Sequence, residues 1–101
     1  MKLQQLRYTL EVYKHNLNVS EAAEALFTSQ PGISKQIRLL EDELGIQIFI
    51  RNGKRVVSVS EPGKQVLQVA ERMLRDAQNI KRIGAEFSDQ DAGSLTIATT
   101  H

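Results

Sequence analysis

The chain has 101 residues, of which 41% are hydrophobic and 25% charged, an ordinary composition for one soluble globular domain. It has no cysteine and only two histidines, which excludes disulfides and thiolate metal sites and leaves too few ligands for a histidine cluster. No apolar run is long enough for a membrane helix and no signal peptide opens the chain, so we expect a cytoplasmic protein without metal, cofactor or membrane partner.

The basic residues are unevenly distributed, although the formal net charge is only +1. Lys35 and Arg38 lie in a segment, residues 28–40, that contains no acidic residue. Residues 51–60 hold three further basic residues, again without an acid. A nearly neutral chain with two purely basic segments can still present one basic face.

Two helices are predicted at the start of the chain. Apolar residues spaced by three and four over residues 3–15 predict an amphipathic first helix. Its inward face is formed by Leu3, Leu6, Leu10 and Tyr13, followed by Leu17. Ser20 is expected to cap a short second helix over residues 20–27, because a serine hydroxyl accepts a hydrogen bond from a free backbone N–H. The inward residues of this second helix are Ala23, Leu26 and Phe27.

A third helix is predicted to follow a turn at residues 28–30. Pro31 lies in its first turn, where a missing N–H costs nothing, and Gly45 follows its last turn. Its inward face holds Ile33, Ile37, Leu40 and Leu44. The acidic run Glu41-Asp42-Glu43 lies at the negative end of the helix dipole, so we expect these acids to face solvent or to pair with nearby basic residues.

A basic hairpin and a long fourth helix are predicted next. Two short strands, residues 47–51 and 55–59, flank Asn52-Gly53-Lys54, and an Asn-Gly pair between β-branched runs favours a tight hairpin. Ser60-Glu61-Pro62 then supplies a capping residue, an acid and a proline at the positions expected for a helix start. The fourth helix is predicted to run to residue 88.

A stripe of apolar and small residues follows the fourth helix at alternating spacings of four and three. This repeat over three heptads is typical of a coiled-coil seam, so we expect two copies of the chain to pair through it. The alternative is that the stripe packs only on the three-helix core. The seam residues are Val66, Ala70, Met73, Ala77, Ile80, Gly84 and Phe87.

The remaining residues, 89–101, are predicted as a polar hinge and the first strand of a truncated effector-binding domain. The chain thus divides into a winged helix–turn–helix (1–59), a linker and dimerisation helix (60–88) and this last segment. The predicted fold class is mainly α, with a three-helix core plus a β-hairpin wing, followed by a long dimerisation linker helix.

The order of two helices, a three-residue turn, a third helix and a basic hairpin is that of a winged helix–turn–helix. The major groove of DNA admits one such helix, whose first turns reach the base edges, so we expect double-stranded DNA as the partner. The outward residues of those turns are Gln30, Pro31, Ser34, Lys35 and Arg38. The hairpin offers three cations for phosphate contact, namely Arg51, Lys54 and Arg55.

Other interpretations stay open at this point. A helical face with serine, lysine and arginine is often only solvated, and a basic hairpin is often only a soluble turn. A winged helix can also bind another protein; binding to DNA through several phosphates would weaken steeply with salt, whereas an apolar protein contact would not. We do not expect an enzyme, because the sequence has no cysteine, no paired histidines and no nucleophile–base set.

Three motifs of the chain resemble the LysR-type transcriptional regulators. Residues 22–26 (AAEAL) and 29–34 (SQPGIS) resemble the helix–turn–helix of that family. Residues 40–51 (LEDELGIQIFIR) resemble its L-E-x-x-L-G-x-x-L-F-x-R run, with Ile48 in place of the usual leucine. Residues 60–63 (SEPG) resemble the start of its linker helix, where threonine is commoner than serine.

The resemblance, which covers residues 1–93, implies a role for each candidate residue. It implies that the outward residues of the third helix, Gln30, Pro31, Ser34, Lys35 and Arg38, read the major groove. It further implies that Ser29 holds the DNA backbone and that Arg51 grips phosphate with the wing residues. The contacts of Lys54 and Arg55 are not fixed by the family motif. The fourth helix would pair antiparallel with that of a second copy.

A narrower resemblance links the chain to the CysB-type regulators of sulfur assimilation and cysteine synthesis. It is carried by residues 1–8 (MKLQQLRY), 15–20 (HNLNVS) and 94–101 (SLTIATTH). It implies an activator of such genes that is a homodimer in this fragment, a homotetramer at full length, and responsive to an acetylserine-type inducer and sulfur anions. Thr100 would lie at the edge of the inducer pocket, but this chain is not expected to respond, because the pocket would lie in the missing effector domain.

Overall fold

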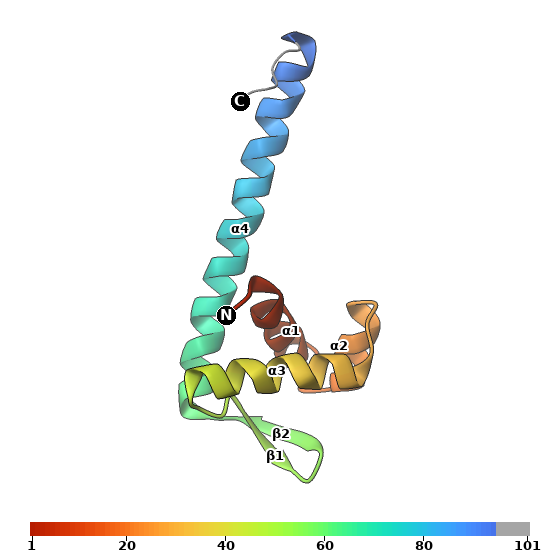
Figure 1. Ribbon diagram of the computed structural model, residues 1–101, viewed down its shortest axis with the longest axis vertical. Helices are drawn as coiled ribbons and strands as arrows, with labels where there is room; N and C mark the ends of the chain where they lie inside the picture. The colour runs from red at the N-terminus through yellow and green to blue at the C-terminus, as the bar shows by residue number, and fades with distance from the viewer. Residues whose placement is uncertain (95–101) are drawn as a thin grey trace.

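The computed structural model describes residues 1–94, with side chains for residues 1–88. In these residues, three helices are followed by a two-stranded antiparallel hairpin and then by a fourth helix. Figure 1 shows a compact body of α1 to α3 and the hairpin, from which α4 extends alone, so that the molecule measures 57 × 25 × 20 Å. This arrangement confirms the predicted fold class, a mainly α winged helix–turn–helix with a long linker helix.

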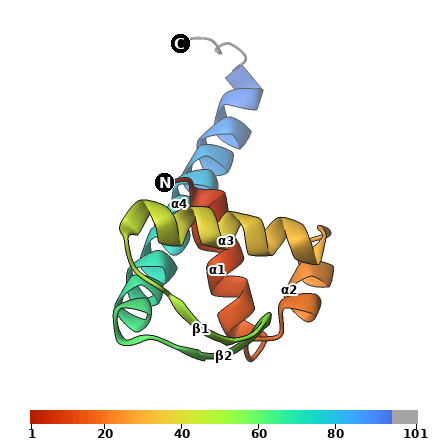
Figure 2. The ribbon, with the colours of Figure 1, turned by 60° about the horizontal axis from the view of Figure 1, so that its bottom comes forward.

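The body is built from α1 (Leu3–Lys14), α2 (Val19–Ala25) and α3 (Gln30–Leu44) around one apolar core. In Figure 2, α3 crosses in front of α1, α2 lies beside the N-terminal end of α3, and the hairpin lies beneath α3. The core also includes the start of the hairpin and the first turns of the last helix. Its buried members are Leu6, Val12, Ala22, Ala23, Ile33, Ile37, Leu40, Ile48, Phe49 and Ala70.

The predicted inward faces were correct only in their central residues. Leu6 and Leu10 of α1 are buried, but Leu3 and Tyr13 at its two ends are half exposed, and Leu44 at the end of α3 is also exposed. Helix ends extend past the small core, so the apolar period continues where there is nothing to pack against. The structure instead buries three α1 residues outside the predicted stripe, namely Gln5, Thr9 and Val12.

The second helix begins and ends differently from the prediction. Its cap is Asn18, whose side chain accepts a hydrogen bond from the Glu21 backbone N–H at 3.0 Å, so Ser20 lies inside the first turn. After Ala25 the chain turns, and Phe27 adopts a left-handed backbone with φ 55°. This conformation carries the phenyl ring out of the core, and Phe27 is 97% exposed rather than inward.

The wing consists of β1 (Phe49–Asn52) and β2 (Arg55–Val59). Asn52 pairs with Arg55, so the loop is the two residues Gly53-Lys54 rather than the predicted three, Asn52-Gly53-Lys54. Gly53 has φ 66°, while Lys54 is not among the residues of positive φ, which is the pattern of a type II′ turn. The register shifts by one residue after Ile50, and this bulge strengthens the local twist of the wing.

The last helix, α4 (Glu61–Ser94), is anchored to the wing at its first turn. The predicted cap is confirmed, because the Ser60 hydroxyl accepts from the Gly63 N–H at 3.0 Å and donates to the Gln47 carbonyl. The Ser60 N–H donates to the Ile48 carbonyl at 2.9 Å. Gly63 packs so closely against that carbonyl oxygen that a Cβ atom at this position would overlap it.

The apolar stripe of α4 changes its role along the helix. Ala70 is buried in the core formed with α1 to α3, and Val66 packs against that core. The alternative that the stripe packs on the three-helix core therefore holds for the first turns of α4. Further along, Ile80 and Phe87 are exposed by 69% and 57%. The core ends where α4 leaves the body, and the stripe continues without a packing partner among the side chains of residues 1–88.

The predicted hinge after residue 88 was wrong in its secondary structure. The helix continues through residues 89–93 to Ser94. No proline interrupts the segment, and a single glycine costs a helix only about 1 kcal/mol relative to alanine, which is too little to end it. A strand was predicted over residues 94–100, but Ser94 is the last residue of α4, and the rest of that segment, including the inducer-pocket residue Thr100, lies outside the described residues. Within the described part of the chain, no helix has the length and apolarity needed to cross a membrane.

Gly63→Ala should lower the free energy of unfolding by about 1–3 kcal/mol, because the new methyl group has to displace the Ile48 carbonyl of the wing. Urea unfolding followed by circular dichroism measures this loss. Gln78→Ala, at an exposed position of the same helix, is the control and should stay within about 0.5 kcal/mol of the parent. Equal effects of the two changes would show that the wing does not fix the start of α4.

Candidate nucleic-acid interface

One exposed surface runs along the first three turns of α3. Ser29 caps the helix, its hydroxyl accepting from the Gly32 N–H at 3.1 Å, and Pro31 occupies the first turn as predicted. Ile33 and Ile37 anchor the opposite face of α3 in the core. The residues predicted to read bases therefore share the outward side, and Gln30, Pro31, Lys35 and Arg38 are exposed while Ser34 is partly buried.

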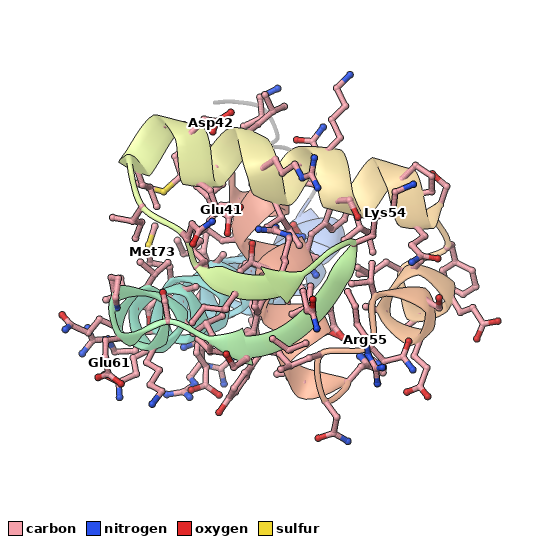
Figure 3. All side chains as sticks on the ribbon, turned by 90° about the horizontal axis from the view of Figure 1, so that it is seen from below. Glu41, Asp42, Lys54, Arg55, Glu61 and Met73 are labelled. Carbon is pink, nitrogen blue, oxygen red and sulfur yellow. The ribbon has the colours of Figure 1, made fainter. Side chains whose placement is uncertain are left out.

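The wing closes one side of this surface. A groove is lined by residues of α3 together with Lys54, which stands at the tip of the hairpin beside α3 (Figure 3). Arg55 is the first residue of β2, and it lines a second hollow on the side of the turn between α1 and α2. The structure thus brings the predicted reading residues and the wing tip together. The groove residues are Gln30, Pro31, Ser34, Lys35, Arg38, Leu39 and Lys54.

The cations of this surface are not neutralised by the chain itself. Among the side chains of residues 1–88, no carboxylate lies within ion-pair distance of Lys35, Arg38, Lys54 or Arg55. Lys35, Arg38 and Lys54 line one groove and Arg55 lines the hollow beside it, so the four exposed charges together produce a positive potential that attracts a polyanion. Such a surface suits the phosphate backbone of nucleic acid.

Arg51 differs from these four cations. Its guanidinium is paired with the buried carboxylate of Glu41, with Nη2 3.1 Å from Oε1, and only 17% of its side chain is exposed. Glu41 also accepts the backbone N–H groups of Ile48 and Phe49 at 2.8 and 3.1 Å. The open expectation for the acidic run is thereby resolved for Glu41, which pairs with arginine. Phosphate contact by Arg51 stays a prediction.

The acids beside Glu41 behave differently. Asp42 is exposed and lies on the side of α3 that faces away from the hairpin, whereas Glu41 lies between α3 and the hairpin (Figure 3). Glu43 is also exposed and pairs with the N-terminal ammonium of Met1 at 2.8 Å. Only one of the three acids therefore has a role in placing the wing, and the acidic run by itself did not indicate which one.

Sequence reasoning missed two residues that organise the surface. Glu41 could have been found from its spacing, because it lies four residues after Ile37 and one after Leu40, on the inward side of α3. Ser20 was interpreted as a cap, but its hydroxyl donates to the side-chain carbonyl of Gln30 at 3.0 Å. That contact joins residues ten positions apart, and no local pattern indicates it.

Glu41→Ala should lower the free energy of unfolding by about 3 kcal/mol, because it leaves two backbone N–H groups and a largely buried guanidinium without their acceptor. Chemical denaturation of the two proteins gives the difference. Asp42→Ala, the neighbouring acid on the solvent side, serves as the control and should change stability by less than about 0.5 kcal/mol. A Glu41 variant as stable as the Asp42 variant would contradict the role of the ion pair.

Comparison with known proteins identifies the family. Residues 3–64 match the family described as "Bacterial regulatory helix-turn-helix protein, lysR family". This stretch spans more than half of the chain and contains α1 to α3, the wing and the start of α4. The chain belongs to the LysR family, and it carries the DNA-binding winged helix–turn–helix of a transcription regulator. The family is one of regulators rather than enzymes.

The chain also matches individual relatives and a DNA complex. It is 55% identical over 101 residues to the HTH-type transcriptional regulator SsuR of Burkholderia cenocepacia, and 52% identical to the regulator CysB of the same species. The match includes all of this chain but only 33% and 32% of those two proteins, so the chain spans about a third of their length. The crystal structure of the BenM DBD with benA site 1 DNA superposes with a TM-score of 0.78 at 31% identity, over 87% of this chain and 97% of that one.

Proposed function

We propose that this chain binds double-stranded DNA with α3 in the major groove and the wing tip on the sugar–phosphate backbone. The observation that carries the proposal is the groove between α3 and Lys54, where exposed hydrogen-bonding side chains and uncompensated cations share one surface. Similarity to a DNA-binding domain whose crystal structure contains its DNA site supports DNA as the partner. In this arrangement Gln30, Ser34, Lys35 and Arg38 face base edges, and Lys54 and Arg55 face phosphates.

The proposed role of each cation follows from its place. Lys35 and Arg38 lie on α3, where hydrogen bonds from their side chains to guanine O6 and N7 would give sequence preference. Lys54 and Arg55 lie on the wing, where contact with phosphate gives affinity without preference.

Two uncharged residues complete the proposed surface. Pro31 offers an apolar surface at the tip of α3 that suits a thymine methyl group. Ser29 keeps a hydroxyl hydrogen for a phosphate while its oxygen caps the helix.

Replacing Lys35 by alanine should weaken binding to a selected site by about 1–3 kcal/mol and relax the preference at particular base pairs. Replacing Lys54 by alanine, the matched change on the wing, should weaken selected and random duplexes equally. It should also reduce the slope of log affinity against log salt by about one unit. Fluorescence titrations at several salt concentrations measure both effects. Salt-independent binding, or a Lys54 variant that alone changes base preference, would contradict the proposed roles.

We further propose that the distal half of α4 pairs with that of a second copy. Met73, Ala77, Ile80, Gly84 and Phe87 continue the heptad pattern beyond the core. An almost wholly apolar hollow begins where this stripe leaves the body, lined by residues that include Met1, Leu44, Val69 and Met73. Burying these surfaces against a second copy removes exposed leucine, isoleucine, methionine and phenylalanine from water.

Ile80→Asp should convert the chain to monomers, because it places a charge in the middle of the proposed seam. Analytical ultracentrifugation over a range of concentrations measures the change. Asn79→Asp introduces the same charge one residue away and should leave the dimer intact, because Asn79 lies outside the heptad positions. If both variants, or neither, become monomeric, the seam is not the contact between copies.

The regulated genes are proposed from relatives. The likeness to SsuR and CysB proteins, and the resemblance of residues 1–8 and 94–101 to CysB-type regulators, support a role as an activator of sulfur-assimilation and cysteine-synthesis genes. A tetramer and an acetylserine-type inducer belong to the full-length protein in this proposal. Because the chain spans about a third of such relatives, these properties require residues beyond it.

A further inference from the structure

Gln30 and Ser20 meet between the two helices of the helix–turn–helix. Gln30 is the first residue of α3 and Ser20 lies in the first turn of α2. The Ser20 hydroxyl donates a hydrogen bond to Oε1 of Gln30 at 3.0 Å. Both residues are exposed, and capping of α2 is already provided by Asn18, so the Ser20 hydroxyl is not needed to hold its own helix.

The place of Gln30 makes this contact relevant to recognition. Gln30 lines the groove that holds Lys35 and Arg38, and it also lines the neighbouring hollow that holds Ser20 and Arg55. A glutamine amide has a carbonyl acceptor at one end and an NH2 donor at the other. Because the carbonyl end is held by Ser20 on the α2 side, the NH2 end is the one left to meet a base.

The orientation of the amide decides which base edge it can match. A glutamine free to aim both ends pairs with adenine, donating to N7 and accepting from N6. A glutamine that presents only its NH2 group matches an edge of acceptors, such as guanine O6 and N7. We propose that Ser20 is a specificity-determining residue that acts through Gln30, by turning its amide so that Gln30 favours guanine over adenine at the base pair it contacts.

This inference rests on the proposed function, and one experiment separates the two. The chain is used to select binding sites from a random duplex pool, for the parent and for Gln30→Ala. The base pair at which Gln30→Ala loses preference is the one read by Gln30. If the parent selects no sequence, the proposed function fails; if it selects one, only the role of Ser20 remains in question.

Ser20→Ala should then shift the guanine-to-adenine ratio at that base pair toward adenine by about three- to tenfold, the range expected for one net hydrogen bond. Ser20→Thr keeps the hydroxyl and should retain the parent ratio. In a Gln30→Ala background, Ser20→Ala should have no further effect, because its partner is gone. Thermal unfolding of each variant checks that the fold is unchanged.

Three results would overturn the role of Ser20. An unchanged base ratio in Ser20→Ala would show that the hydrogen bond does not direct the amide. A shift toward guanine would show that the amide has the opposite orientation. An equal loss of affinity for selected and random duplexes, which persists without Gln30, would show that Ser20 contacts phosphate directly.

Discussion

The carboxylate of Glu41 joins α3 to the wing through three partners. It projects from the inward side of α3, accepts the backbone N–H groups of Ile48 and Phe49, and pairs with Arg51. Burial makes each of these contacts stronger than in water, and it makes the loss of any partner expensive. The start of β1 is therefore held at a fixed place along α3, and the distance between the helix and the wing tip follows from it.

The rest of the interface depends on this attachment. The hairpin has only two short strands, and an isolated hairpin is marginal in water. With its first strand fixed by Glu41 and its core residues Ile48 and Phe49 fully buried, the tip carries Lys54 to the groove in front of α3. The cations of the surface thus fall into two kinds. Arg51 holds the framework together, while Lys35, Arg38, Lys54 and Arg55 keep their charge available for a polyanion.

The order of elements was predictable from local sequence patterns, because capping residues, turn glycines and apolar periods act over a few positions. Pro31, Gly45 and Ser60 all mark helix ends where they were expected. The errors occurred where packing between elements decides the outcome. Phe27 fits the apolar period of α2 but turns outward, and the heptad stripe of α4 reads as one seam although its first residues pack in the core.

The sequence predicted which residues lie at the candidate site better than it predicted what each of them does there. The outward face of α3 follows from the helical period once the core face is known, so Gln30, Lys35 and Arg38 lie where they were expected. Period alone does not distinguish a cation that is free from one that is paired. The bond between Ser20 and Gln30 and the pair between Glu41 and Arg51 each join two elements. The spacing of Glu41 on α3 indicates that it faces inward, but spacing within one element does not indicate the partner of either residue.

The close packing of Gly63 against the wing couples the direction of α4 to the position of the wing. A helix of 34 residues is about 51 Å long, so a tilt of about 5° moves its far end by about 4 Å. At its base the glycine backbone lies directly on the Ile48 carbonyl, with no side chain between them to absorb such a tilt. A displacement imposed at the distal end is therefore transmitted as torque to the wing and, through the Glu41 carboxylate, to α3. The orientation of α3 is therefore coupled, through the wing, to the position of the far end of α4.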